Sequence, residues 1–120
     1  MRLRTNRTEA FTFENAIITK DSEGTTGYGW GKPFVLIGVM WSGSGKIQQE
    51  KYGVRLPMVR NIMLDGKYVE RTEDSKVSYT VNGHTLTVGD GLCYRSDDKP
   101  DYIIRAIYPY DHLAVELEHL

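Results

Sequence analysis

The sequence contains a single cysteine, Cys93, so it cannot form an internal disulfide framework. No apolar run approaches the roughly 18 residues that a membrane-spanning helix needs. Neither sign of charge dominates, because 15 Lys and Arg stand against 16 Asp and Glu, a formal net charge of −1. A protein that coats nucleic acid should be strongly basic, and a disordered chain should carry more net charge and fewer apolar residues than the 40% found here. These absences leave a globular domain.

What the sequence does contain favours β-structure. Its 120 residues suit one domain, and 12 of them are glycine and 8 tyrosine. Glycine combined with many Tyr, Val, Ile and Thr residues is typical of strands joined by turns. The N-terminal segment 1–8 is basic but lacks the apolar stretch of a signal peptide. The lone cysteine fits a reducing compartment. We expect residues 1–120 to form a single β domain, with residues 1–9 as a flexible N-terminal arm.

The charges are unevenly distributed along the chain. Residues 1–60 carry nine Lys and Arg against five Asp and Glu, whereas residues 61–120 carry six against eleven, giving +4 and −5. The fold can interleave the two halves, in which case the asymmetry has no consequence. Alternatively, the molecule has one basic and one acidic side, and such a molecule could stack head-to-tail in a ring.

The first half of the chain shows two strand patterns separated by glycine. Residues 11–19 alternate imperfectly and predict one strand. Four glycines in eight residues disfavour a helix, so residues 24–33 are expected to be a flexible loop. The continuous apolar run 34–41 predicts a strand buried on both faces, and residues 42–45 predict a second flexible loop.

The middle of the chain is less regular. Gly53 and Pro57 oppose a long helix, so we expect an irregular extended segment that leads into a strand at 59–64. Asp65-Gly66 predicts a tight hairpin to a return strand at 67–70, and residues 71–76 predict a solvated loop.

The last third gives clearer patterns. Residues 77–81 and 84–88 flank Asn82-Gly83, which predicts a second hairpin. A polar loop at 95–101 precedes a strand at 102–108. Residues 112–120 fit either a strand or a helix, and pairing with 102–108 favours the strand. Seven or eight short strands in one chain predict an all-β, single-domain barrel or sandwich with long glycine-rich loops.

Catalytic and cofactor motifs are not evident. Gly45-Lys46 has Met40 where a phosphate loop needs its first glycine, and Ile47 follows the lysine instead of Ser or Thr. His112 and His119 would lie on opposite faces of a strand, so surface or half-buried histidines are more plausible than a metal site. Cys93 lies between apolar neighbours and predicts a packed thiol. We therefore expect no enzymatic activity, no metal and no cofactor.

Binding of single-stranded nucleic acid is an alternative. Four basic residues lie in one segment near aromatic side chains, and such combinations can follow a phosphate backbone: Lys46, Lys51, Arg55 and Arg60. On this hypothesis the chain is a small β-barrel module, and its stacking residues are Trp41, Tyr52 and Tyr79.

Two blocks of the sequence resemble a known family. One runs from Gly89-Asp90-Gly91 through a polar loop, Pro100-Asp101-Tyr102, an apolar strand and an Asp111-His112 turn to a final strand ending at Leu117. The other is the Tyr-Gly segment 48–56. These two blocks resemble the minor capsid and head-completion, or stopper, proteins of tailed phages and prophages of Gram-positive bacteria.

This resemblance implies a structural virion protein at the head–tail junction, present in the host cytoplasm during assembly. It implies a β-barrel with long loops that forms a homo-oligomeric ring between the portal or its adaptor and tail-side connector proteins. It implies no enzymatic activity and no cofactor, and it admits contact with packaged DNA in the channel. The family supplies no residue-level site. From the loops and charges of this chain we place the assembly interface near Trp30, Lys32, Lys46 and Arg55.

Overall fold

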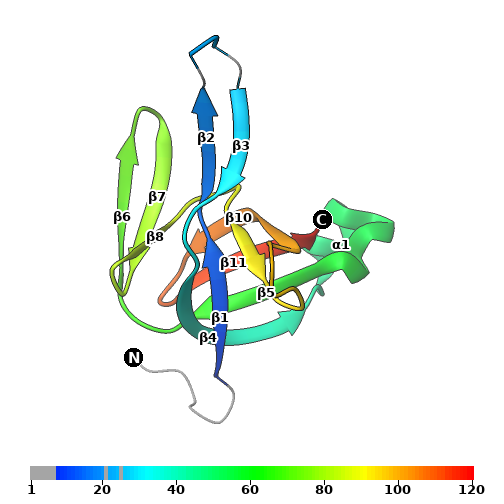
Figure 1. Cartoon of the computed structure of the whole chain (residues 1–120). Coiled ribbons are helices and arrows are strands. Elements are labelled where there is room, and N and C mark those ends of the chain that lie inside the picture. Colours follow the sequence, from blue (N-terminus) through cyan, green and yellow to red (C-terminus); the bar gives the residue numbers. More distant parts are fainter. Residues whose placement is uncertain (1–7, 21, 25) are drawn as a thin grey trace.

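Six strands close into an antiparallel β-barrel (Figure 1). The computed structural model describes residues 8–20, 22–24 and 26–120. Around the barrel the order is β1 (Glu9–Glu14), β4 (Phe34–Ser42), β5 (Val59–Leu64), β11 (Leu113–His119), β10 (Tyr102–Pro109) and β9 (Gly91–Cys93), which pairs back with β1. The all-β fold class predicted from the sequence is confirmed, and the architecture is a barrel. Of the expected N-terminal arm, residues 1–7 lie outside the described residues, whereas Glu9 already belongs to β1.

Three excursions leave the barrel (Figure 1). The first is a two-stranded hairpin, β2 (Ala16–Lys20) and β3 (Thr26–Trp30), which rises from the top of the barrel in this view. The second is a three-stranded sheet, β6 (Tyr68–Glu73), β7 (Lys76–Val81) and β8 (His84–Leu86). The third joins β4 to β5 at the right: helix α1 (Lys46–Tyr52) and the 3₁₀ helix η2 (Gly53–Met58). In the described part of the chain, no helix is long and apolar enough to cross a membrane.

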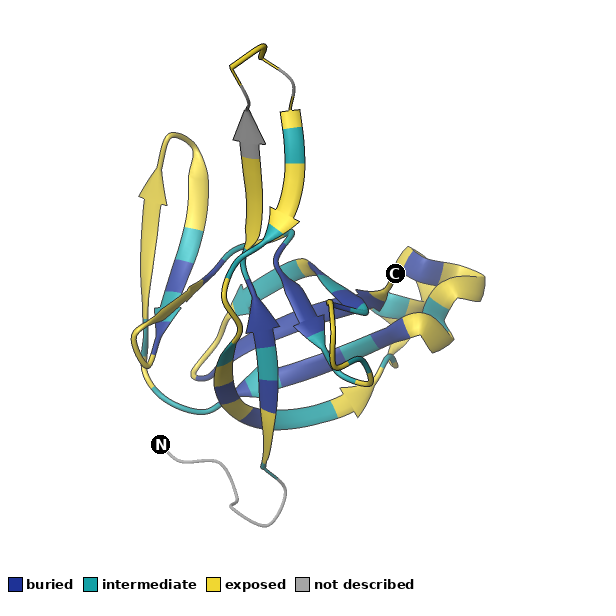
Figure 2. Ribbon diagram, in the orientation of Figure 1, coloured by how far each residue is buried: buried dark blue, intermediate teal, exposed yellow. Residues whose placement is uncertain are grey.

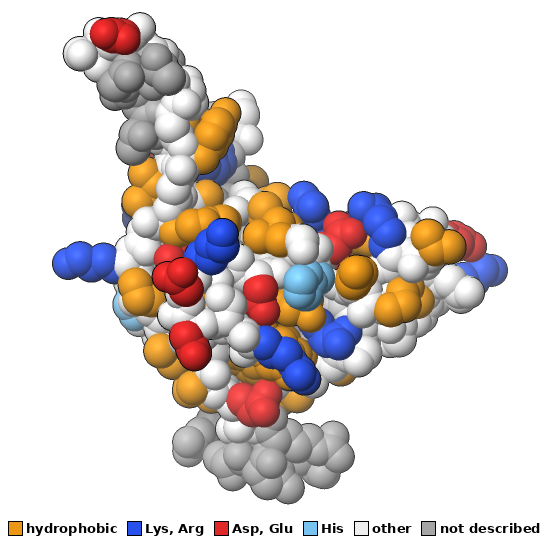
Figure 3. Space-filling view, turned by 45° about the vertical axis from the view of Figure 1, so that its right-hand side comes forward, with side chains coloured by type: hydrophobic (Ala, Val, Ile, Leu, Met, Phe, Trp, Pro, Cys, Tyr) orange, Lys and Arg blue, Asp and Glu red, His pale blue; other side chains and the backbone are white. Residues whose placement is uncertain are grey.

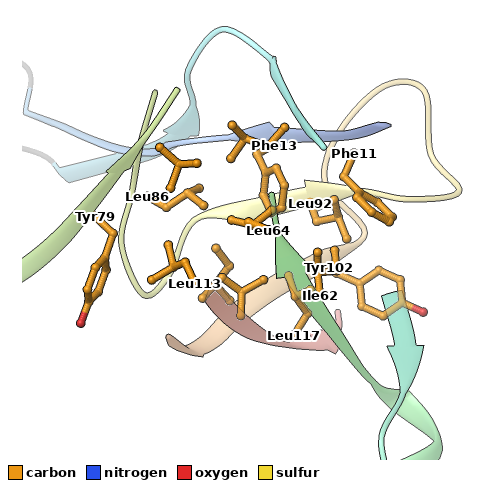
Figure 4. Close-up of a cluster of buried hydrophobic side chains, with 14 residues drawn as sticks. Phe11, Phe13, Ile62, Leu64, Tyr79, Leu86, Leu92, Tyr102, Leu113 and Leu117 are labelled. Carbon is orange, nitrogen blue, oxygen red and sulfur yellow. The ribbon is translucent and has the colours of Figure 1, made fainter. Parts of the chain in front are cut away.

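The core fills the barrel and extends under the three-stranded sheet. Inward side chains of the barrel strands meet there, as the twofold alternation of a strand requires (Figure 4). Figure 2 shows the contrast between this buried barrel and the exposed ends of both hairpins. The buried cluster comprises Phe11, Phe13, Leu36, Ile62, Leu64, Tyr79, Val81, Leu86, Leu92, Tyr102, Ile104, Leu113, Val115 and Leu117.

The single strand predicted for 11–19 is wrong. The chain breaks at Asn15, after which β1 stays in the barrel and β2 enters the projecting hairpin. The reason is a polar anchor: the Asn15 amide and the Ala16 backbone N–H both donate to the buried carboxylate of Asp90. The flexible loop predicted for 24–33 is also wrong over half of its length, because β3 pairs with β2 along five residues of each strand.

The run 34–41 is a strand, as predicted, but it is not buried on both faces. Leu36 is 1% exposed and points into the barrel, whereas Val35 and Ile37 are 52% and 39% exposed. An antiparallel barrel wall has one solvated face, so a continuous apolar run here leaves apolar side chains outside.

The expectation of an extended segment from 46 onward is wrong, although the strand at 59–64 is confirmed as β5. Residues 46–58 are helical instead. Gly53, with φ of 56°, ends α1 after only seven residues, and Pro57 lies in the short 3₁₀ turn that follows. The two residues that oppose a long helix are therefore compatible with two short ones.

The Asp65-Gly66 hairpin is wrong as well. β5 pairs with β4 and β11, while β6 pairs with β7. The predicted loop at 71–76 is instead the tip of the β6–β7 hairpin, where Asp74 and Ser75 both adopt positive φ. Such a turn normally carries glycine, so the sequence gives little sign of it.

The remaining expectations agree with the structure. Asn82 and Gly83 both have positive φ and connect β7 to a short β8, as the dipeptide predicts. Residues 95–101 form a loop without regular structure between β9 and β10. The C-terminal segment is strand β11, paired antiparallel with β10, rather than a helix.

Candidate functional site

Helix α1 and η2 are fastened to the outside of the barrel by polar side chains. Tyr52, at the end of α1, is the only buried residue of the two helices and is 6% exposed. Their large apolar residues Ile47, Val54 and Met58 are 82%, 98% and 51% exposed. The usual arrangement, with the apolar face inward, is absent from this segment. Its attachment therefore depends on hydrogen bonds and ion pairs.

The centre of this attachment is Glu116 on β11, whose side chain is 2% exposed. One carboxylate oxygen accepts from Lys51 Nζ at 2.6 Å and from the Tyr52 hydroxyl at 2.5 Å. The other accepts from Gln48 Nε2 at 2.8 Å and from the Tyr108 hydroxyl at 3.3 Å. All four donors converge on one carboxylate, which is what a buried charge requires.

These contacts determine which protonation state each group prefers. Burial disfavours the Glu116 carboxylate, but hydrogen bonds from Lys51, Tyr52 and Gln48 outweigh it and lower the pKa of Glu116. The hydrogen bond to Glu116 raises the pKa of Lys51. Burial, together with the same carboxylate, raises the pKa of Tyr52 to about 12. At neutral pH the site is therefore a charged Glu116–Lys51 pair with neutral tyrosines.

A second carboxylate, Glu118, lies two residues further along β11 on the same outer face. It pairs with Arg55 of η2 at 3.1 Å and with Arg105 at 3.1 Å, and is itself 7% exposed. Arg105 lies where the β10–β11 register shifts between Ile104 and Ala106. An irregularity of this kind changes the direction in which a side chain points. Arg55 also lies over the Tyr52 ring, with its guanidinium carbon 5.5 Å from the ring centroid.

A shallow groove of about 280 Å³ opens beside this attachment. Its sides are aromatic and aliphatic, with Trp41 from β4, Ile47 from α1, and Tyr108 and Tyr110 at the end of β10. The last two rings stack, with centroids 5.8 Å apart and an interplanar angle of 8°. Asn61 and Glu116 are buried side chains that also line the groove, and both are already hydrogen-bonded to Gln48. The groove therefore combines exposed apolar side chains with polar groups whose hydrogen bonds are already made.

The β2–β3 hairpin presents a second apolar surface. Ile18 and Tyr28 are directly opposite each other in the ladder and so share a face, on which they are 67% and 82% exposed. Ala16 and Trp30 form the next pair on that face, nearer the barrel. Two strands alone are at best marginally stable in water. A hairpin that projects with isoleucine and tyrosine exposed is thus a surface suited to a partner.

The base of this hairpin is held firmly. Asp90, 1% exposed, accepts hydrogen bonds from Asn15 Nδ2, from the Ala16 N–H and from the Thr87 N–H, all at 2.8–2.9 Å. Beside it the Trp30 ring packs over Gly91, where an added Cβ would meet the ring at 2.9 Å. The direction of the hairpin is therefore set by buried contacts at its base.

The four residues predicted at an assembly interface fall into two pairs. Trp30 ends β3, half-buried at the base of the hairpin, and exposed Lys32 follows two residues later. Lys46 begins α1 and Arg55 lies in η2, both exposed. The structure thus places one pair at the base of the hairpin and the other in the α1–η2 segment, and it does not bring all four together.

The stacking residues of the nucleic-acid alternative are mostly inaccessible. Tyr52 and Tyr79 are 6% and 7% exposed, so neither can stack on a base in this structure, and Trp41 alone is open at 41%. The basic residues Lys51 and Arg55 are engaged by Glu116 and Glu118.

Cys93 and His112, considered above as nucleophile and metal ligand, both lie in well-defined surroundings. Cys93 is half-buried and donates to Glu14 at 3.2 Å, and burial together with that carboxylate raises the pKa of the thiol to about 12. This agrees with a packed thiol. His112 is 7% exposed and so more buried than expected. Across residues 8–20, 22–24 and 26–120, no group of three or more His, Cys, Asp or Glu side chains could hold a metal ion.

Acidic residues from both halves of the sequence meet in one groove of about 540 Å³, with Glu9 and Glu14 from the basic half and Asp97 and Asp98 from the acidic half. The barrel therefore interleaves the two halves at this groove. The α1–η2 segment is locally basic in sequence, with Lys46, Lys51 and Arg55 against Glu50.

Sequence reasoning missed Glu116, Asp90 and the Ile18–Tyr28 pair. Glu116 alternates with Val115 and Leu117 and so reads as an ordinary solvated position. The role of Glu116 depends on helix α1, which Gly53 and Pro57 made an unexpected element in the sequence. Asp90 lies between two glycines and is therefore expected to be a turn residue.

Comparison of the chain with known protein families, with curated proteins and with solved structures finds no match.

Proposed function

We propose that this chain is a structural subunit of the head–tail connector of a tailed phage. In this role copies assemble as a ring between the portal or its adaptor and the tail. The observation that carries the proposal is the β2–β3 hairpin, which holds Ile18 and Tyr28 67% and 82% exposed on one face, away from the barrel (Figure 1). A surface of this kind suits a subunit whose neighbours complete it.

Two further features support the same role. The C-terminal block that resembles the head-completion proteins, from Gly89 to Leu117, supplies β9, β10 and β11, half of the barrel wall. The second block, residues 48–56, covers most of α1 and the first turn of η2. The resembling residues thus form one continuous part of the molecule, in which Glu116 of one block binds Gln48, Lys51 and Tyr52 of the other.

The test is deletion of the gene from the phage that carries it, followed by induction and negative-stain electron microscopy of the lysate. We expect separate heads and finished tails, and restoration of joined particles when the wild-type gene is supplied from a plasmid. The DNA content of the separated heads then shows whether the protein retains the genome. Joined, infectious particles from the deletion strain would contradict the connector role.

A further inference from the structure

The chain carries two unpartnered apolar surfaces that differ in shape. One is a projecting ribbon, the face of the β2–β3 hairpin with Ala16, Ile18 and Tyr28 exposed. The other is concave, the groove beside α1 with Trp41, Ile47 and Tyr110 exposed at 41%, 82% and 62%. A projecting surface and a concave surface on the same molecule are the two halves of a head-to-tail contact.

The two surfaces cannot meet within one copy. In Figure 1 the hairpin rises from the top of the barrel, while α1 lies at its right-hand side, and the rotated view in Figure 3 keeps them apart. The base of the hairpin is fixed by Asp90, which bonds to Asn15, Ala16 and Thr87. The hairpin is therefore held away from the groove of its own chain.

The chemistry of the two surfaces matches. The groove has an aromatic and aliphatic rim and a volume of about 280 Å³, which suits one large side chain, and Tyr28 is the most exposed aromatic residue among the described ones. Aromatic rings in edge-to-face or offset-stacked contact stabilise a complex by more than the burial of their surface alone. Trp41, Tyr108 and Tyr110 offer such partners. Figure 3 shows hydrophobic and basic side chains intermixed over the projecting α1 side.

The charges of the two surfaces are opposite in sign. The hairpin turn carries the exposed Glu23, and the exposed Lys46 begins the helix beside the groove, whereas Lys51 and Arg55 are already paired with Glu116 and Glu118. Opposite charges at the edges of a contact steer encounter and fix its direction more than they add affinity.

We propose that the β2–β3 hairpin of one copy lies in the α1 groove of a neighbouring copy, with the Tyr28 ring between Trp41 and Ile47. This inference rests on the proposed function, because a head-to-tail contact of this kind generates a closed ring when its rotation closes. The side chains expected at the contact include Trp30 on the hairpin side and Lys46 on the groove side.

Cysteine cross-linking between different copies tests the contact directly. In a Cys93→Ser background, one chain carries Tyr28→Cys and a second chain carries Ile47→Cys. The two are mixed at high concentration and oxidised with copper–phenanthroline. We expect a disulfide-linked heterodimer at least tenfold more abundant than in a matched mixture in which Val69→Cys replaces Tyr28→Cys. Val69 is 64% exposed on the other hairpin and so controls for random collision.

The same pair is then placed in one chain and supplied to the deletion phage. We expect a ladder of linked multimers in isolated particles on a non-reducing gel. We also expect Tyr28→Glu and Ile47→Glu to abolish head–tail joining, and Val69→Glu to leave it intact. All three positions are exposed, so these variants should fold, which circular dichroism checks.

The outcomes separate the two proposals. Restoration of joined particles by the wild-type protein supports the connector role. If, in that case, no ladder forms, no heterodimer exceeds the control and both glutamate variants still join heads to tails, the hairpin–groove contact is wrong and the connector role stands. If the deletion strain makes joined particles, the connector role is wrong. A heterodimer well above the control with purified protein would still support the contact in that case.

Discussion

The Tyr52 hydroxyl donates a 2.5 Å hydrogen bond to Glu116, joining the last residue of α1 to the outer face of β11 across 64 positions of sequence. Lys51 and Gln48 bind the same carboxylate, so one buried side chain holds both turns of a short helix. A seven-residue helix has little stability of its own in water. The groove side of the proposed ring contact therefore depends on Glu116.

Replacement of Glu116 by Gln should destabilise the fold markedly. The variant loses the charge that four donors share, and it turns an NH₂ group toward some of them. We expect a loss of about 2–3 kcal/mol in the free energy of unfolding, near the lower end for a broken buried pair because the half-exposed Lys51 can turn to water. Urea unfolding measures it. Glu50→Gln, an exposed position on the same helix, is the control and should change stability by less than about 0.5 kcal/mol.

The same carboxylate should make stability depend on acidic pH. Its pKa is lowered in the folded state, so the unfolded state binds the proton more readily. The stabilisation is present above the ordinary value of 4.5 and is lost as pH falls through the lower folded value. Unfolding free energies measured from pH 7 down to pH 3 should fall more steeply for the wild type than for Glu116→Gln. Parallel curves would show that Glu116 does not contribute the dependence.

Gly91 should tolerate no side chain. An added Cβ would lie 2.5 Å from Pro100 Cβ and 2.9 Å from the Trp30 ring, so either the loop or the ring must move. We expect Gly91→Ala to lower the free energy of unfolding by about 1–3 kcal/mol, a typical value for overpacking. Gly29→Ala on β3 is a matched control, because nothing lies within 4 Å of its Cβ. If thermal denaturation gives equal stabilities for the two variants, the close packing at Gly91 is wrong.

Asp90 should control the direction of the β2–β3 hairpin. It is 1% exposed and accepts from two backbone amides and the Asn15 side chain. Asp90→Ala leaves these donors unpaired and should lower the free energy of local opening at the hairpin base by about 2–3 kcal/mol, given the strength of hydrogen bonds to a charged acceptor. Hydrogen exchange should show faster exchange at Ala16 and Thr87, while β10 and β11 stay protected. Equal acceleration throughout would mean that Asp90 supports the barrel rather than the hairpin.

The elements of the fold differ in how well the sequence predicts them. Strands with a clear hydrophobic pattern and a turn dipeptide were predictable, as with β7, Asn82-Gly83 and β8. The break at Asn15 was not, because it follows from a bond to Asp90, 75 positions away. The glycine stretch 24–33 suggested a loop, yet glycines at 27 and 29 are accommodated in β3 because β2 supplies the ladder partners.

The interface residues chosen from loops and charges stay a prediction. Trp30 and Lys32 lie at the base of the β2–β3 hairpin, and Lys46 and Arg55 lie in α1 and η2. The residues that create the two apolar surfaces, Ile18, Tyr28 and Ile47, carry no local signal of exposure. An isoleucine in a strand pattern normally indicates core, and only the three-dimensional arrangement shows that β2 leaves the barrel.

Cys93 should be nearly unreactive in the folded protein. Its thiol donates to Glu14, and burial with that carboxylate raises its pKa from 9.0 to about 12. Because the thiolate is the nucleophile, a rise of this size lowers the thiolate fraction near pH 8 by roughly three orders of magnitude. A thiolate of higher pKa is also a stronger nucleophile, which recovers roughly 20-fold of this loss. A colorimetric disulfide reagent at pH 8 should therefore react with the native chain roughly 30-fold more slowly than with the chain in denaturant. Glu14→Gln removes part of the cause and should give an intermediate rate, since burial remains. Equal rates for the native and the denatured chain would mean that the Cys93–Glu14 bond does not form.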